Sequence, residues 1–300
     1  MVGIGVEVAL ELWAASLRDV KERIRPLFTQ QRVAVSAGLF LDGLLGLERR
    51  KTGWMRAEAA GDRGPWRQQA ILGRGRWQAD ALRDLVRAYA LETLAERDAV
   101  LAIDETGFLK QGKGSCGVAR QYTGSAGKIT NCQIGVFAAY VSRHGHAFID
   151  RALYLPKAWT DDPARLVAAH VPPKMGFATK PRLALAMIER AVAAKVPFMW
   201  VAADSVYGVG EIEMALRRAG KGYVLGVNGT TPSTPGATSR RWPARRRRSP
   251  RHCPRRRGRA SRPAREPRAH GSTTGPISSW LTSRLPSTTT ASPVYGRGAS

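Results

Sequence analysis

The sequence has few acidic residues and few cysteines. It has 23 Asp and Glu against 48 Lys and Arg, a formal net charge of +25. Its three cysteines lie far apart, with no CxxC pair, which argues against a disulfide framework or zinc site and indicates a reducing compartment. No apolar run approaches the roughly 20 residues of a membrane span, and the opening "MVGIGVEVAL" lacks the basic stretch of a signal peptide. We therefore expect a cytoplasmic protein with no membrane partner.

The positive charge is unevenly distributed. Residues 229–300 contain 16 arginines, no lysine and one acidic residue, Glu266, a net charge of +15. The preceding residues carry 32 basic and 22 acidic side chains, a net charge of +10. A body this basic favours a polyanionic partner, with nucleic acid first.

Residues 1–97 have the pattern of a helical, DNA-binding region. "LWAASLRDVKERIRPLF" and "WQADALRDLVRAYALETLAE" repeat apolar residues at helical spacing. Between helices, "GDRGPWRQQAILGRGRWQ" combines two tryptophans with four arginines: Arg63, Arg67, Arg74 and Arg76. Cations suit phosphates and aromatic planes suit bases, so this segment predicts a DNA contact. The alternative is a solvated basic loop whose tryptophans pack in the core.

Residues 98–228 change to a mixed α/β pattern. Three extended runs, "AVLAID", "TNCQIGVFAAYVSRHG" and "HAFIDRALYLP", are followed by helical stretches that alternate with "PFMWVAAD" and "GYVLGVN". The predicted order is β-β-β-α-β-α-β, which indicates a mixed sheet with helices on its faces.

Two of these runs end on an aspartate, Asp104 in "VLAIDETGF" and Asp204 in "FMWVAADSVYG". If the two strands are neighbours, the carboxylates meet at one edge of the sheet. They then repel each other unless a cation lies between them, and hard oxygen ligands select Mg²⁺ or Mn²⁺. Such sites catalyse phosphoryl transfer on nucleic acids. The alternative is that both aspartates are ordinary turn or cap residues.

Several long blocks resemble bacterial DDE-type insertion-sequence transposases, in particular the insertion sequence 701-like family of the RNase H-like superfamily. They include "DETGFLKQGKGSCGVARQYTGSAGKITNCQIGVF", "RALYLPKAWTDDPARLVAAHVP", "GFATKPRLALAMIERA" and "WVAADSVYG". The resemblance implies an RNase H-like core, with Asp104 and Asp204 as catalytic metal ligands for Mg²⁺ or Mn²⁺. It implies terminal-repeat and target DNA as partners, a possible homo-oligomer on DNA, and a bacterial cytoplasmic protein that joins the nucleoid when bound to DNA.

Residues around the two aspartates have secondary roles. Glu105 follows Asp104 on a strand, so its side chain is expected on the opposite face and not as a ligand. Tyr207 and Gly208 are expected to shape the turn after Asp204. A basic group after the first strand suits phosphate contacts, or else a solvated loop: Lys110, Lys113, Arg120 and Lys128.

The family's third carboxylate, a helical glutamate, has no counterpart. The resemblance stops near Asn228, and residues 229–300 are rich in Arg, Pro and Ser, a composition that predicts disorder. "RRWPARRRRSP" and "STTGPISSWLT" can each be back-translated so that a frame one base earlier spells ordinary protein similar to the family's inserted segment. We interpret the chain as C-terminally truncated by a frameshift after about residue 228; the alternative is a genuine basic tail that binds DNA.

The sequence therefore predicts a DDE transposase for metal-dependent DNA cleavage and strand transfer, inactive in this chain because the third acidic ligand is missing. The alternative is a non-catalytic DNA-binding fragment, acting as an inhibitor of the full-length enzyme or as a pseudogene product. A weaker alternative is an RNase H-like nuclease outside transposition.

Overall fold

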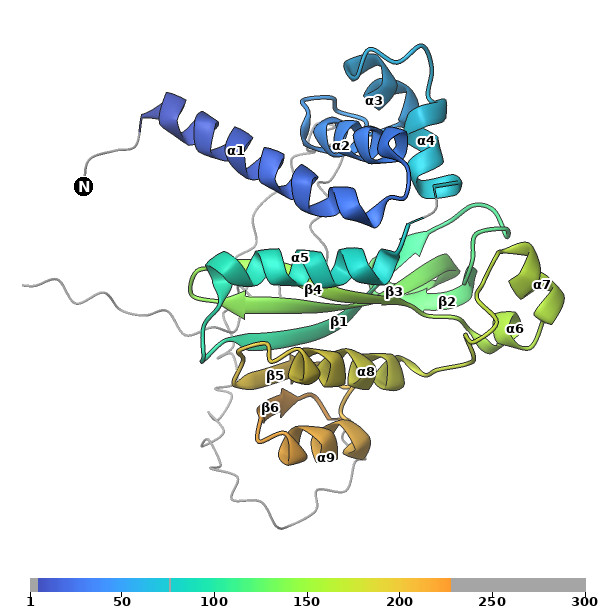
Figure 1. Ribbon diagram of the computed structural model, residues 1–300. Coiled ribbons are helices and arrows are strands. Elements are labelled where there is room, and N and C mark those ends of the chain that lie inside the picture. The colour runs from blue at the N-terminus through green and yellow to red at the C-terminus, as the bar shows by residue number, and fades with distance from the viewer. Residues whose placement is uncertain (1–4, 76, 228–300) are drawn as a thin grey trace, which may run out of the picture. The chain divides into compact units, whose positions relative to one another are not determined.

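The computed structural model describes residues 5–75 and 77–227, so the expected disordered tail lies outside the described residues. The N-terminal region is helical, as the sequence predicts (Figure 1). Its elements are α1 (Val6–Ile24), the 3₁₀ turn η1 (Arg25–Leu27), α2 (Gln31–Leu45), α3 (Gly53–Ala59), α4 (Trp66–Gly73) and α5 (Ala79–Leu94). None of the helices in these described ranges is both long and apolar enough to cross a membrane.

A six-stranded mixed sheet follows. Its elements are β1 (Val100–Leu109), β2 (Ala119–Thr123), β3 (Lys128–Ser142), β4 (Gly145–Leu153), α6 (Lys157–Thr160), α7 (Pro163–Ala168), α8 (Lys180–Ala193), β5 (Trp200–Ala203), α9 (Gly210–Arg218) and β6 (Gly222–Leu225). The strand order is β2-β3-β1-β5-β6, and β4 also pairs with β3. β1, β2 and β4 run antiparallel to β3, whereas β5 and β6 extend the sheet in parallel with β1. The fold is thus the expected mixed α/β core, preceded in the chain by N-terminal helices.

The sequence defines several helix ends by local chemistry. The side chain of Thr179 accepts the N–H of Arg182 at 3.3 Å, and Pro181 occupies the first turn of α8. At the C-terminal end of α9, Gly220 has a φ of +64°, a left-handed conformation that favours glycine. This local chemistry fixes where α8 begins and where α9 ends.

Two details of the strands differ from the sequence prediction. β1 does not end at Asp104 but continues to Leu109, because β3 pairs with it along its whole length. The stretch expected to be a basic loop contains an additional strand, β2, whose register pairs Arg120 with Asn131. The polar segment "ARQYT" has no apolar alternation to reveal a strand, so only its pairing with β3 defines it.

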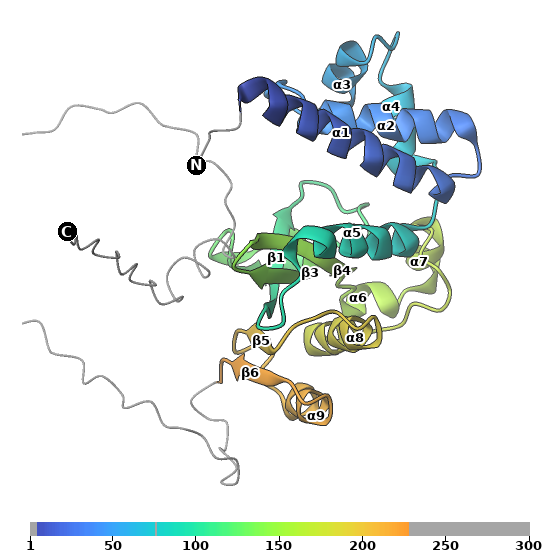
Figure 2. The same cartoon turned by 60° about the vertical axis from the view of Figure 1, so that its left-hand side comes forward.

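The two faces of the sheet are covered unequally. Leu101 and Ile103 are buried in a core formed with α5, α8 and α9, of which α8 and α9 lie side by side (Figures 1 and 2). On the opposite face, Phe137 packs between Phe108 and Phe148, with ring centroids 6.3 and 5.3 Å away. Phe108 and Phe148 remain 46% and 54% exposed within the described part of the chain. Alternation along β1 places Asp104 on this less covered face.

Candidate active site

Asp104 and Asp204 come together through the parallel pairing of β1 and β5. Ile103 and Ala203 are the last residues paired in that register, and an aspartate follows each of them. Because side chains alternate along strands, the carboxylate of Asp104 lies on the face of Ala102, away from the helical core, and Asp204 follows directly after β5 beside it. The pairing of β1 with β5 therefore makes neighbours of two residues that are a hundred positions apart in the sequence.

The environment disfavours two ionised carboxylates. The pKa of Asp104 is raised to about 6, first by partial burial and then by the negative charges of Glu105 and Asp204. The pKa of Asp204 is raised as well, by partial desolvation of its carboxyl group and by Glu105, although this residue is the more exposed of the pair. The ammonium group of Lys180 opposes both increases.

Backbone hydrogen bonds orient each carboxylate. The N–H of Glu105 donates to Oδ1 of Asp104 at 2.8 Å, and the N–H of Val206 donates to Oδ1 of Asp204 at 2.9 Å. Among the described residues, Oδ2 of each aspartate has no hydrogen-bond donor. Each side chain therefore keeps an oxygen available to a ligand.

This donor set fits a hard divalent cation, but only in part. Oriented aspartate oxygens with raised pKa values are typical ligands for Mg²⁺ or Mn²⁺, since a cation removes their mutual repulsion. Within residues 5–75 and 77–227, however, no cluster of three Asp, Glu, His or Cys side chains could hold a metal ion. The described residues supply two carboxylates and no third.

The side chain of Glu105 lies on the opposite face of β1 from that of Asp104. Its carboxylate pairs with the ammonium group of Lys180 at 2.7 Å and accepts a hydrogen bond from the hydroxyl of Tyr207. Tyr207 is fully buried, and burial together with Glu105 raises the pKa of its hydroxyl. The side chain of Glu105 thus lies on the face of α8, as its position in the strand predicts.

Tyr207 also belongs to the turn that follows Asp204, because its N–H donates to the carbonyl of Asp204 at 3.2 Å. The Glu105–Tyr207 hydrogen bond therefore ties this turn to β1, beside Asp104.

Lys180 was not identifiable from the sequence, because its contact depends on how α8 packs across the sheet. Lys180 is the first residue of α8, and this position does not indicate that Glu105 is its partner.

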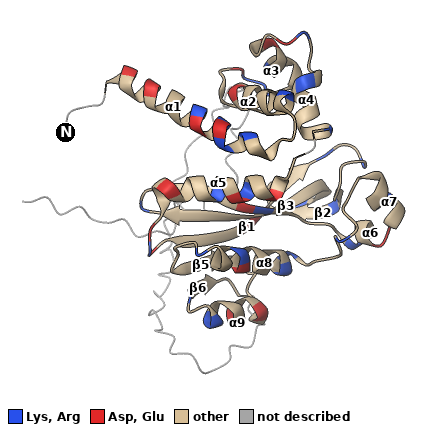
Figure 3. Ribbon diagram, viewed as in Figure 1, with Lys and Arg blue, Asp and Glu red and all other residues tan. Residues whose placement is uncertain are grey.

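The four basic residues expected after the first strand share one end of the sheet. Lys110 follows β1 and donates its N–H to Asn131, which pairs on its other side with Arg120. Lys113 lies in the loop that follows, and Lys128 begins β3. Figure 3 shows Lys and Arg, in blue, distributed over both the helical region and the sheet. Lys110 is six residues beyond Asp104, about 20 Å along an extended strand. A phosphate-binding role for these residues stays a prediction.

The N-terminal arginines are divided between different environments. Arg67 on α4 pairs with the buried carboxylate of Asp62 at 2.7 Å. Arg63 is exposed in the turn before α4, and Arg74 follows that helix. Arg76 lies outside the described residues. Of the three described arginines, Arg67 and Arg74 thus lie on or directly after α4, and Arg63 lies in the turn before it.

Comparisons with known proteins identify the family of the chain. A sequence profile described as "DDE superfamily endonuclease" matches residues 23–286. The chain belongs to this family of DDE endonucleases. The match extends beyond Asn228, where the block-by-block resemblance ends.

Among particular relatives, the "Probable transposase for insertion sequence element IS701" of Microchaete diplosiphon is 33% identical over 133 residues. The aligned part is 44% of this chain and 32% of that relative, so the chain spans about a third of it. Among solved structures, the piggyBac transposase synaptic complex with hairpin DNA aligns with 71% of this chain and 46% of its own, at 13% identity and a TM-score of 0.34. The Mos1 transpososome before cleavage aligns with 63% of this chain and 58% of its own, at 10% identity and a TM-score of 0.16.

Proposed function

We propose that the chain is a DDE transposase of an insertion sequence, in which Asp104 and Asp204 are two of the metal ligands for DNA cleavage and strand transfer. The observation that carries the proposal is the β1–β5 register, which ends at Ile103 and Ala203 and brings the two aspartates together. Membership of the DDE endonuclease family supports the same assignment.

In this proposal, the two aspartates hold Mg²⁺ or Mn²⁺ through oxygens on the open face of the sheet. Bound metal ions supply activation of a water or 3′-hydroxyl nucleophile and stabilisation of the leaving oxygen. The protein's own contribution is orientation: backbone N–H groups fix one oxygen of each aspartate. Lys180 and Tyr207 hold Glu105 on the other face.

We further propose that the chain itself binds DNA without cleaving it efficiently. A complete site needs a third carboxylate, and the described residues place none beside Asp104 and Asp204. This same observation favours the second candidate function, a non-catalytic DNA-binding protein that competes with an intact transposase for transposon ends. Terminal repeats and target DNA are the proposed partners in both cases.

A strand-transfer assay separates these possibilities. Purified chain is incubated with Mg²⁺ or Mn²⁺, labelled duplexes that carry matched transposon ends, and a target plasmid. Duplex binding without end joining is the expected result, and addition of the chain to an intact relative should reduce joining. Cleavage that is independent of the terminal repeats would instead indicate a nuclease outside transposition. Efficient end joining that is lost in Asp104→Asn would contradict the proposed inactivity of the chain.

A further inference from the structure

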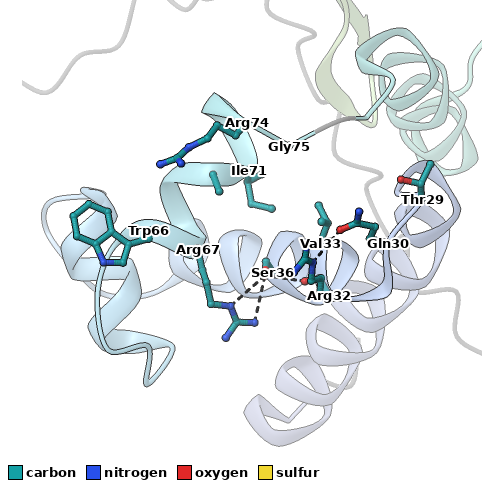
Figure 4. Close-up of a pocket in the computed structure, with 11 residues that line it drawn as sticks. Thr29, Gln30, Arg32, Val33, Ser36, Trp66, Arg67, Ile71, Arg74 and Gly75 are labelled. Atoms are coloured by element: carbon teal, nitrogen blue, oxygen red, sulfur yellow. Dashed lines mark hydrogen bonds between the residues drawn. The ribbon is translucent and has the colours of Figure 1, made fainter.

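A pocket of about 650 Å³ lies in the helical region, and its lining residues all precede the two aspartates in the sequence (Figure 4). Residues from the start of α2 and from α4 form its walls, among them Arg32, Val33, Ser36, Trp66, Arg67 and Arg74. Its volume is in the range of pockets that hold organic ligands and is much larger than a single phosphate group needs.

The pocket is positively charged. Arg32, Arg67 and Arg74 line it, and none of the described lining residues is acidic. Arg67 pairs with Asp62, and its guanidinium also contacts the hydroxyl of Ser36 at 3.3 and 3.4 Å, which fixes it at the wall. Arg32 and Arg74 have no carboxylate partner within the described part of the chain. These two side chains can therefore donate to an anion.

Apolar surface accompanies these cations. Val33, Ala70 and Ile71 contribute to the lining. Trp66 also lines the pocket, and 66% of its surface is exposed. An exposed indole beside guanidinium groups suits a ligand with both a planar apolar part and an anionic part. A nucleotide unit has this chemistry, because its base stacks on an aromatic side chain while its phosphate accepts from arginine.

We propose that this pocket binds a DNA strand, with phosphates on Arg32 and Arg74 and a sugar or base against Trp66. The inference rests on the proposed function for the identity of the polymer and assigns the part of the helical region that contacts it. Arg32 had no role in the sequence prediction; it lies near the start of α2, whereas Arg74 directly follows α4, and both line the pocket (Figure 4). Arg67 is held at the pocket by its contacts with Ser36 and Asp62.

The test measures how DNA affinity of the full-length chain depends on salt. Each phosphate contact contributes about 0.9 to the slope of log K against log salt concentration for duplex DNA. The double variant Arg32→Ala/Arg74→Ala should bind more weakly and reduce that slope by about 2. The matched control Arg49→Ala/Arg50→Ala removes the same charge from exposed positions outside the pocket and should change the slope by less than half as much.

Duplex and single-stranded oligonucleotides of equal length are titrated in parallel. A larger loss for one of them identifies the form of DNA in the pocket, and both outcomes support the proposal. Trp66 emission provides a second readout. DNA should quench the wild-type chain more than Trp66→Phe, whereas Trp54→Phe, whose ring lies 6.5 Å from that of Trp66 but outside the pocket, should retain most of the quenching.

Equal slopes for the pocket variant and its control, with both forms of DNA, would overturn the pocket assignment. If the wild-type chain still binds DNA in that case, the proposed function stands without this pocket. If the wild-type chain binds no DNA at all, both proposals fail. Asp104→Asn/Asp204→Asn should leave the pocket's contribution to the slope intact, which keeps the two sites separate experimentally.

Discussion

Ile103 of β1 and Ala203 of β5 are the last paired residues in the parallel register of these strands. This register places the next two residues side by side: Asp104 within β1, which continues to Leu109, and Asp204 directly after β5. A shift of this register by one residue would send one carboxylate into the core of α8 and α9. The candidate metal site is therefore a property of strand pairing more than of either aspartate alone.

The raised pKa of Asp104 predicts a pH-dependent gain in stability on its removal. A carboxyl group whose pKa is higher in the folded than in the unfolded protein favours folding below the unfolded value of about 3.8 and loses that contribution as pH rises through about 6. Asp104→Asn should therefore resemble wild type near pH 4 and be more stable near pH 7. We expect a gain of about 1–2 kcal/mol, allowing for solvent screening of a half-buried group.

Thermal unfolding of both proteins between pH 4 and 8, without divalent cations, measures this difference. Addition of Mg²⁺ or Mn²⁺ at pH 7 should stabilise the wild type and leave Asp104→Asn unchanged, because the variant lacks a ligand. A stability difference that is constant across this pH range would argue against desolvation and charge repulsion at Asp104.

Tyr207→Phe should weaken metal binding through the turn that carries Asp204. The substitution keeps the buried ring and removes the hydrogen bond to Glu105, which should cost about 1–3 kcal/mol of unfolding free energy. Because the turn is then less firmly held against β1, we expect about ten-fold weaker Mn²⁺ binding. Titration followed by electron paramagnetic resonance measures the affinity.

Tyr140→Phe is the matched control for this experiment. Tyr140 is also fully buried, and its hydroxyl contacts the backbone of Glu96 and Pro197, away from the two aspartates. It should lower stability by a similar amount without changing the affinity for Mn²⁺. Equal losses of Mn²⁺ affinity in both variants would show that Tyr207 affects general stability and does not position Asp204.

A chain that ends at Asn228 should still bind duplex DNA. This shortened chain lacks the arginines of residues 229–300 but keeps a net charge of +10, together with the arginines of the helical region. Affinity measured by fluorescence anisotropy should fall steeply between 50 and 200 mM salt, because phosphate contacts release counterions. Complete loss of binding in this shortened chain would assign DNA binding to the removed residues, not to the helical region.

The frameshift hypothesis predicts the nucleotide sequence of the gene. Codons 225–300, read one base earlier, should encode ordinary protein with a helical glutamate after the inserted segment. The protein in the restored frame should cleave DNA in Mg²⁺, and Asp104→Ala or Asp204→Ala should abolish that cleavage. Stop codons or a second low-complexity sequence in the earlier frame would rule out the frameshift and favour a genuine basic tail.

Local sequence patterns were sufficient for most of the order of helices and strands, but not for β2. Helical spacing predicts α1 and α5, and the apolar runs before Asp104 and Asp204 predict β1 and β5. The pattern failed where pairing supplies the stability. The strand β2 is short and polar, and β1 extends past Asp104 only because β3 continues to pair with it as far as Leu109.

The sequence by itself determined which residues could be ligands, since two aspartates follow apolar runs and family-like blocks surround them. Only the tertiary structure decided that they meet, because the strand register is a contact between segments a hundred residues apart. The contacts of Glu105 with Lys180 and Tyr207 arise in the same way, from the packing of α8 and the turn after β5 against β1. Side-chain chemistry is encoded locally, whereas the proximity on which a site depends comes from folding the whole sheet.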